Sequence, residues 1–335
     1  MPLCHLSTFS MALSIEGRHE AGQRQLRSQR LSFGFRAIFW RSGSDSYSVE
    51  GMNDPIQEIT AGDGTTIPLY WYPATGTGTV LLLLPALGIQ AKLYRRLAEQ
   101  LCDRGHSVAV MEQRGHGNSA LRPSYSCQFS LDDLLEFDIP AALDWLELQS
   151  PGCKIVLGGH SLGGHLSTIY AGRAPSRLAG VLHLACAFPH YLDYPGKERL
   201  LLRFLCTVMP LFKLAPGYYP GGLMGFGSRE SIGMMMQWRQ WCLSGSFDYD
   251  GHTNIAVAGA FTGSVLAIAF EQDNFATQAA IERALSPLSG ANVSRVSLGA
   301  EEQGEYLGHV NWARSPEGTS ACIAQWLAGL STGSH

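Results

Sequence analysis

The sequence predicts an α/β protein with a mostly parallel sheet, helices on both faces of that sheet and a helical insertion late in the chain. Three observations support this fold class. From residue 56 onward, short apolar runs alternate with segments of helical spacing. A serine flanked by glycines joins one apolar run directly to a helical segment. Between residues 188 and 250 the alternation stops, and aromatic residues, Met, Pro and Gly become frequent.

The predicted strands are short runs of apolar or alternating residues. The run at 80–84 is continuously apolar, as expected for a parallel strand that is buried on both faces. The first two strands lie on either side of the turn at 62–64, which contains two glycines. Strands are predicted at 56–60, 67–72, 80–84, 107–111, 155–157, 181–185, 265–270 and 293–298.

The predicted helices are longer segments whose apolar residues recur every three or four positions. Leu93, Leu97 and Leu101, for example, fall on one side of such a segment. Helices are predicted at 93–104, 131–149, 162–172, 277–285 and 320–330. Because strands and helices alternate, the strands should pair mostly in parallel.

This pattern divides the chain into four parts. Residues 1–51 are rich in Arg and Ser and poor in acidic residues, which favours a disordered or spurious N-terminal extension over a transit peptide. Residues 52–187 and 251–335 are expected to form the two parts of one α/β core. We expect residues 188–250, hereafter the insertion, to form a helical cap on that core.

Composition excludes several classes of function. The formal net charge of -4 argues against a nucleic-acid-binding protein, which usually carries a basic stripe. The 8 cysteines are scattered and include no CxxC pair, which is typical of free thiols in a reducing, cytoplasmic compartment. No His/Cys group has zinc-ligand spacing, so we expect no metal and no cofactor. The longest uncharged apolar stretch, 255–270, is shorter than the roughly 20 residues that a membrane-spanning helix needs.

Ser161 is the predicted nucleophile. Residues 159–163 read Gly-His-Ser-Leu-Gly, which matches the GxSxG pattern, but residues 329–333 match it as well. The first match follows a predicted strand and opens a predicted helix, whereas the second follows a helix at the end of the chain. A strand-to-helix turn holds the serine hydroxyl above the sheet, and the flanking glycines leave room for the tight turn.

A serine needs a base to take its proton, and the base needs an acid to orient it. His309, in a loop before the last predicted helix, is the predicted base. Asp273 follows the strand at 265–270 and is the predicted acid, with Glu271 and Asp193 as alternatives. The oxyanion of the tetrahedral intermediate needs two donors. We assign these to the backbone N–H groups of Leu162, directly after the serine, and of Leu87, in the loop after the strand at 80–84.

With these residues placed, the chain from about residue 57 to 330 resembles the α/β-hydrolase superfamily. Residues 158–164 read Gly-Gly-His-Ser-Leu-Gly-Gly, a form similar to that of monoacylglycerol-lipase-like and serine-aminopeptidase-like members. Residues 113–119 resemble the Arg-Gly turn of the family, and the whole layout is most similar to a bacterial branch of predicted hydrolases. The chain departs from the family at Pro85-Ala86, where His-Gly is frequent, and at Glu112, where Asp is frequent. The first departure affects the oxyanion loop, and we expect the second to affect packing.

The resemblance implies an α/β-hydrolase fold and a serine hydrolase that acts on a small molecule. In the insertion, Met234, Trp238 and Trp241 share one helical face and are the predicted substrate-binding residues for an apolar acyl group, carried as an ester or thioester. Three alternatives stay open. In the first, these side chains form only the core of the insertion; in the second, the substrate is a peptide or amide; in the third, the chain binds a ligand without turning it over.

Overall fold

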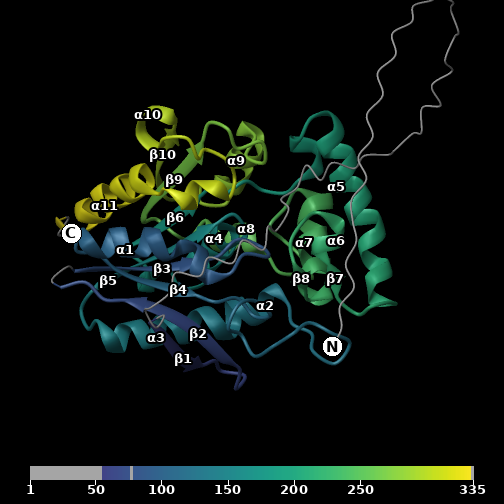
Figure 1. Cartoon of the computed structure of the whole chain (residues 1–335), viewed down its shortest axis with the longest axis horizontal. Helices are drawn as coiled ribbons and strands as arrows, with labels where there is room; N and C mark the ends of the chain where they lie inside the picture. Colours follow the sequence, from purple (N-terminus) through teal and green to yellow (C-terminus); the bar gives the residue numbers. More distant parts are fainter. Residues whose placement is uncertain (1–54, 76–77, 333–335) are drawn as a thin grey trace, which may run out of the picture. The chain divides into compact units, whose positions relative to one another are not determined.

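The computed structural model describes residues 55–75 and 78–332, so the expected extension at 1–51 lies outside the described residues. The described strands form an eight-stranded sheet in the order β1-β2-β4-β3-β5-β6-β9-β10 (Figure 1). Their bounds are β1 Ile56–Thr60, β2 Thr66–Tyr72, β3 Thr79–Leu84, β4 Ser107–Met111, β5 Lys154–His160, β6 Gly180–Leu184, β9 Ser264–Phe270 and β10 Asn292–Leu298. Strand β2 runs antiparallel to β1 and β4, and every other neighbouring pair is parallel, which confirms the predicted fold class.

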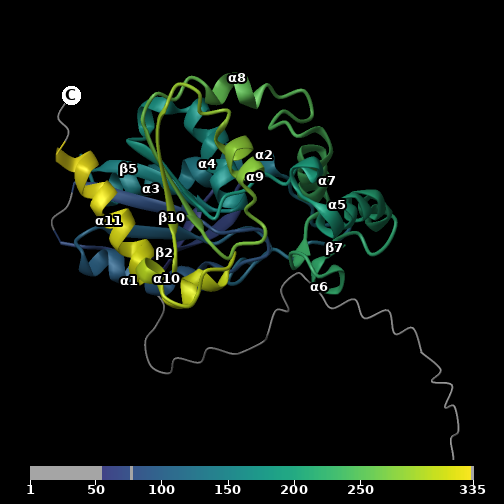
Figure 2. The ribbon, with the colours of Figure 1, turned by 90° about the horizontal axis from the view of Figure 1, so that it is seen from above.

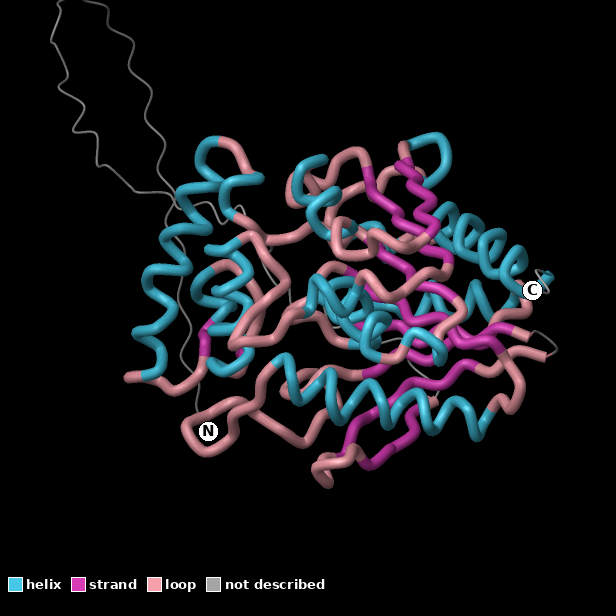
Figure 3. The backbone as a smooth tube through the Cα atoms, turned by 180° about the vertical axis from the view of Figure 1, so that it is seen from behind, coloured by secondary structure: helices cyan, strands magenta, loops and turns pink. Residues whose placement is uncertain are grey.

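Helices cover both faces of this sheet (Figure 3). The alternating side chains of β3 divide the core: Leu82 and Leu84 pack with α3, α4 and α9, whereas Leu81 and Leu83 pack with α1 and α11. The helices outside the insertion are η1 Ala91–Tyr94, α1 Arg95–Asp103, α2 Leu131–Asp133, η2 Leu134–Asp138, α3 Ile139–Gln149, α4 Leu162–Arg173, η3 Pro175–Arg177, α8 Asn254–Ala258, α9 Gln278–Leu285, α10 Ala300–Gln303, η6 Asn311–Arg314 and α11 Glu317–Thr332. None of the helices among the described residues is long and apolar enough to cross a membrane.

The helix predicted at 131–149 is present but widens into the π-helical turn η2 near its N-terminal end. Pro140 gives the physical reason, because it lacks the N–H that would continue the α-helical hydrogen bonds at that point. The helix predicted at 93–104 likewise begins as the short 3-10 turn η1 before α1.

The eight strands of the large sheet all lie outside the insertion, a segment that the structure describes throughout. Figures 1 and 2 show α5, α6 and α7 grouped with β7 and β8, apart from these strands. The short antiparallel pair β7–β8 was not expected from the sequence. The elements of the insertion are η4 Tyr191–Asp193, α5 Gly196–Val208, η5 Met209–Lys213, β7 Tyr219–Pro220, α6 Gly221–Met224, β8 Arg229–Glu230 and α7 Ile232–Ser244.

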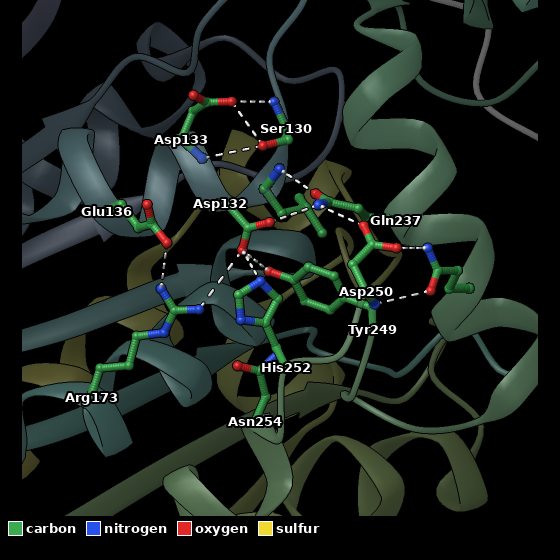
Figure 4. A network of polar contacts seen from close by, with 12 residues as sticks. Ser130, Asp132, Asp133, Glu136, Arg173, Gln237, Tyr249, Asp250, His252 and Asn254 are labelled. Atoms are coloured by element: carbon green, nitrogen blue, oxygen red, sulfur yellow. Dashed lines mark hydrogen bonds and ion pairs between the residues drawn. The ribbon is translucent and has the colours of Figure 1, made fainter. Parts of the chain in front are cut away.

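A polar junction centred on Asp132 joins the insertion to the core (Figure 4). The carboxylate accepts hydrogen bonds from the Tyr249 hydroxyl at 2.6 Å and from Gln237 Nε2 of α7 at 2.7 Å. It also pairs with Arg173 Nη2 of α4 at 3.8 Å and lies 3.5 Å from His252 Nε2. One carboxylate of α2 therefore contacts α4, α7 and the segment that leads back into the sheet.

Candidate active site

Ser161 lies in a strained turn between β5 and α4. Its φ of 51° and ψ of -111° fall in a region that L-residues seldom adopt. Its N–H donates to the carbonyl of Leu184 at 3.0 Å, which fixes the turn to the end of β6. The turn thus places Ser161 at the carboxyl end of the parallel strands and at the N-terminus of α4, the position that the sequence predicts for a nucleophile.

The glycines on either side of Ser161 are required by close contacts. A methyl group at Gly159 would lie 1.9 Å from the carbonyl carbon of Gly163. A methyl group at Gly163 would lie 2.2 Å from the carbonyl oxygen of Leu84, at the end of β3. This contact brings the end of β3 against the start of α4.

His309 and Asp273 lie together, as the sequence predicts. His309 Nδ1 is 2.8 Å from Asp273 Oδ2, and the other carboxylate oxygen accepts the N–H of Phe275 at 2.9 Å. The Asp273 side chain is fully buried, whereas that of His309 is 20% exposed. A buried carboxylate therefore orients a histidine ring that solvent and small molecules can reach.

The two alternative acids lie elsewhere. Asp193 binds Arg283 of α9 in a two-pronged contact, with 2.9 Å between Asp193 Oδ1 and Arg283 Nη2. Glu271 is exposed, and its carboxylate lies against the backbone of Gly299. Of the three candidate acids, Asp273 is the one that contacts His309.

His160 connects the serine turn to the histidine loop. Its Nε2 lies 2.7 Å from the carbonyl oxygen of His309, and its Nδ1 lies 2.8 Å from the Tyr94 hydroxyl. The centroids of the His160 and His309 rings are 5.1 Å apart. Because His160 directly precedes Ser161, these contacts bring His309 next to the serine turn.

The positions of the protons on Tyr94 and His160 follow from the groups that each side chain contacts. The Tyr94 oxygen accepts the N–H of Ala86 at 3.0 Å, so its own proton is directed to His160 Nδ1. Burial raises the pKa of Tyr94, and burial together with His309 holds the pKa of His160 well below its usual value. His160 is therefore neutral and carries its proton on Nε2, which donates to the His309 carbonyl.

Buried side chains from other segments hold the loop that carries Leu87 in place. Gln113 Nε2 donates to the carbonyl of Pro85 at 2.8 Å. Glu112 Oε1 accepts the N–H of Ala91 at 2.9 Å. Together with the Tyr94 contact, these bonds fix both ends of the loop at residues 85–91. We call it the oxyanion loop, after the role predicted for it from the sequence. Glu112, which we expected to bear on packing, is fully buried, and its carboxylate also holds one end of this loop.

The three predicted substrate-binding residues are all buried in one core cluster but have different neighbours. Trp241 is fully buried, and its indole N–H donates to the carbonyl of Phe247 at 3.1 Å. Its ring packs against His165 of α4, which favours the alternative that it anchors the insertion to the core. Trp238 packs against the half-buried ring of Phe226, with centroids 5.0 Å apart. Met234 is buried in the same core cluster.

Tyr94→Phe is expected to lower kcat/KM at least about tenfold. The change leaves the Ala86 N–H and His160 Nδ1 buried without a partner, and each costs about 1–3 kcal/mol. Because both groups adjoin the predicted nucleophile or its loop, the loss should fall on kcat as well as on stability. Tyr249→Phe is the matched control: it removes another buried hydroxyl, bonded to Asp132 at 2.6 Å. It should lower the melting temperature and leave kcat unchanged; equal kcat effects would contradict the role of Tyr94.

Sequence reasoning missed Tyr94, His160 and Gln113. The available signal was the position of His160, which directly precedes the predicted nucleophile. Tyr94 and Gln113 offered no such signal, because their roles depend on contacts across the fold. Among the described residues, no three His, Cys, Asp or Glu side chains gather in a way that could hold a metal ion.

One family model and several curated proteins match parts of this chain. A family described as serine aminopeptidase, S33 matches residues 77–237. Human monoglyceride lipase is 27% identical over 152 residues, which cover 44% of this chain and 48% of that protein. A putative non-heme haloperoxidase of Mycobacterium phage D29 is 29% identical over 112 residues, 33% of this chain and 37% of the relative. These matches thus span less than half the length of either relative.

Solved structures are similar over most of the chain. The complex of DcsB with its substrate analogue has a TM-score of 0.61 at 16% identity and covers 83% of this chain and 99% of that one. The haloalkane dehalogenase DbeA from Bradyrhizobium elkani has a TM-score of 0.60 at 17% identity, with the same coverage. A thermophilic esterase from Thermogutta terrifontis has a TM-score of 0.53 at 18% identity and again the same coverage. At these identities the similarity is one of fold.

Proposed function

We propose that this chain is a serine hydrolase of the α/β-hydrolase superfamily, which cleaves esters or thioesters of apolar acyl groups through an acyl-enzyme on Ser161. The match of residues 77–237 to the serine aminopeptidase, S33 family and the fold shared with solved hydrolase structures support this proposal. The observation that carries this proposal is the contact of 2.8 Å between His309 and Asp273, beside the strained turn of Ser161. A nucleophile, a base and an orienting acid are the parts that acyl transfer requires.

The proposed reaction assigns one task to each residue. His309 takes the hydroxyl proton of Ser161 as its oxygen attacks the acyl carbon, and Asp273 stabilises the resulting imidazolium. The N–H groups of Leu87 and Leu162 donate to the oxyanion of the tetrahedral intermediate. His309 then gives its proton to the departing alcohol or thiol, and a water activated by the same ring releases the acid and regenerates Ser161.

The preference for an apolar acyl group is supported by Phe226 and Trp238. Phe226 directly precedes Gly227, whose backbone would lie 2.8 Å from a methyl group at Gly88 in the oxyanion loop. The aromatic pair therefore adjoins the loop that would hold the reacting carbonyl. On this proposal the insertion covers the active site as a cap, and Trp238 with Met234 forms part of the acyl site.

Peptide or amide hydrolysis is the second candidate, favoured by the description of the matching family. A peptide substrate that is recognised by its charged amino terminus needs an acid to bind that amine. The acids near the oxyanion loop already have partners inside the protein: Glu112 accepts the N–H of Ala91, and Glu230 accepts the N–H of Ser228. This arrangement favours an uncharged acyl group.

A series of p-nitrophenyl esters of increasing chain length tests the proposal. Each buried methylene contributes about 0.8 kcal/mol, so kcat/KM should rise about fourfold per carbon from acetate to about octanoate and then level off. Trp238→Ala should flatten this rise and keep activity on acetate. Activity that peaks at acetate, or turnover of aminoacyl anilides in place of esters, would contradict the proposed substrate class.

A further inference from the structure

One part of the insertion lies directly on the oxyanion loop. Residues 219–230, here called the hairpin, contain β7 and β8, and Tyr219 pairs with Glu230 across them. The tip of the hairpin meets Gly88, where a methyl group would lie 2.8 Å from backbone atoms of Gly227 and Ser228. Gly88 also has a φ of 77°, which favours glycine. The hairpin and the oxyanion loop therefore contact each other backbone to backbone.

A buried ion pair holds the hairpin in this place. His116 Nε2, in the turn after β4, lies 3.2 Å from both carboxylate oxygens of Glu230. The two side chains are 2% and 0% exposed. Glu230 Oε1 also accepts the N–H of Ser228 at 2.7 Å. The same carboxylate thus binds the core through His116 and fixes the residue that touches Gly88.

The electrostatic surroundings make this pair depend on the charge of His116. Burial lowers the pKa of His116, but the carboxylates of Glu230 and Glu112 outweigh burial and raise it overall. The other groups that face the pair are the carbonyl of Arg114 at Nδ1 and the hydroxyl of Tyr219, whose pKa is raised by burial and by Glu230. The guanidinium of Arg114 binds Asp63 and Asp138 instead. When His116 is protonated, its imidazolium is the cation that faces Glu230.

We propose that His116 and Glu230 act as a latch that holds the hairpin on the oxyanion loop and thereby positions the oxyanion donors. The catalytic part of this inference rests on the proposed hydrolase function. Because the pKa of folded His116 is raised, the latch contributes its full stability below the ordinary histidine pKa of about 6.5. That contribution is lost as the pH rises through the raised value, so the latch should loosen under alkaline conditions.

Hydrogen exchange of backbone amides tests the latch without relying on turnover. Glu230→Gln keeps the size of the side chain and removes its charge. At neutral pH we expect amides of residues 219–230 and 86–91 to exchange at least about tenfold faster than in the wild type, because breaking a buried pair is strongly destabilising. Amides of α11 should be unchanged. Glu198→Gln, which removes an exposed pair with Lys197 in the same insertion, is the matched control and should change neither segment.

The wild-type protein supplies a second readout that needs no substitution. After correction for the intrinsic pH dependence of exchange, protection of residues 219–230 should fall as the pH rises past neutrality, and Glu230→Gln should abolish this dependence. In ester hydrolysis the variant should lose kcat more than it raises KM, because oxyanion donors act mainly in the transition state.

The outcomes separate this inference from the proposed function. If the wild type hydrolyses esters and Glu230→Gln changes neither the protection of the hairpin nor kcat, the latch is overturned. The proposed hydrolase function would then still stand. A wild type that hydrolyses no ester, but whose hairpin loses protection on Glu230→Gln and at alkaline pH, would support the latch and contradict the proposed function.

Discussion

Ser161→Ala is expected to abolish reaction with fluorophosphonate probes and to lower kcat by about 10⁴- to 10⁶-fold. The hydroxyl of Ser161 is the proposed attacking atom, and alanine leaves no group that could form the acyl-enzyme. Small residual hydrolysis by water can persist, because the oxyanion donors would remain in place. Mass spectrometry of the labelled peptide, together with ester kinetics, measures both effects.

Ser331→Ala is the matched control, because residues 329–333 also match the GxSxG pattern. Ser331 lies within α11, far along the chain from any strand end. Its replacement should change neither labelling nor turnover. Labelling that survives Ser161→Ala would contradict the assignment of the nucleophile. A wild type that binds apolar ligands but neither labels nor turns over would favour the non-catalytic alternative.

Asp273→Asn is expected to lower kcat by about 10⁴-fold with little change in melting temperature. The amide can present its N–H₂ to His309 Nδ1, which stabilises the imidazole tautomer that cannot accept the proton of Ser161. Ester kinetics against pH and a thermal melt give the two readouts.

Glu271→Gln is the control for this acid. It changes an acid two residues away that is exposed and does not contact His309. We expect less than about a twofold change in kcat, since surface substitutions have small effects. A large loss in Glu271→Gln with none in Asp273→Asn would show that the acid is assigned to the wrong residue.

Much of the fold follows from local patterns in the sequence. The strand at 107–111 was predicted with its observed bounds, because a short apolar run between a helix and a turn has few other interpretations. The π-helical turn at Leu134–Asp138 depends on how the chain accommodates Pro140, and the periodicity of apolar residues does not reveal it. The pair β7–β8 has two residues in each strand, too few for an alternating pattern.

The residues of the candidate site also divide into those that local sequence patterns predict and those that depend on contacts between distant residues. Ser161, Asp273 and His309 could be proposed because each follows from its place relative to a strand end and from the chemistry it must perform. Tyr94 and His116 could not, because their partners lie 66 and 114 residues further along the chain. Contacts of that separation depend on the folded arrangement and leave no periodic trace.

The junction at Asp132 has a consequence for exchanging parts between related proteins. Gln237 lies on α7 in the insertion and Arg173 at the C-terminal end of the helix that Ser161 begins, and both contact this carboxylate. A foreign insertion that lacks the counterpart of Gln237 would leave Asp132 of the recipient without this hydrogen bond. A chimeric protein should therefore exchange α2 together with residues 188–250. Exchange of residues 188–250 alone would separate Asp132 from Gln237.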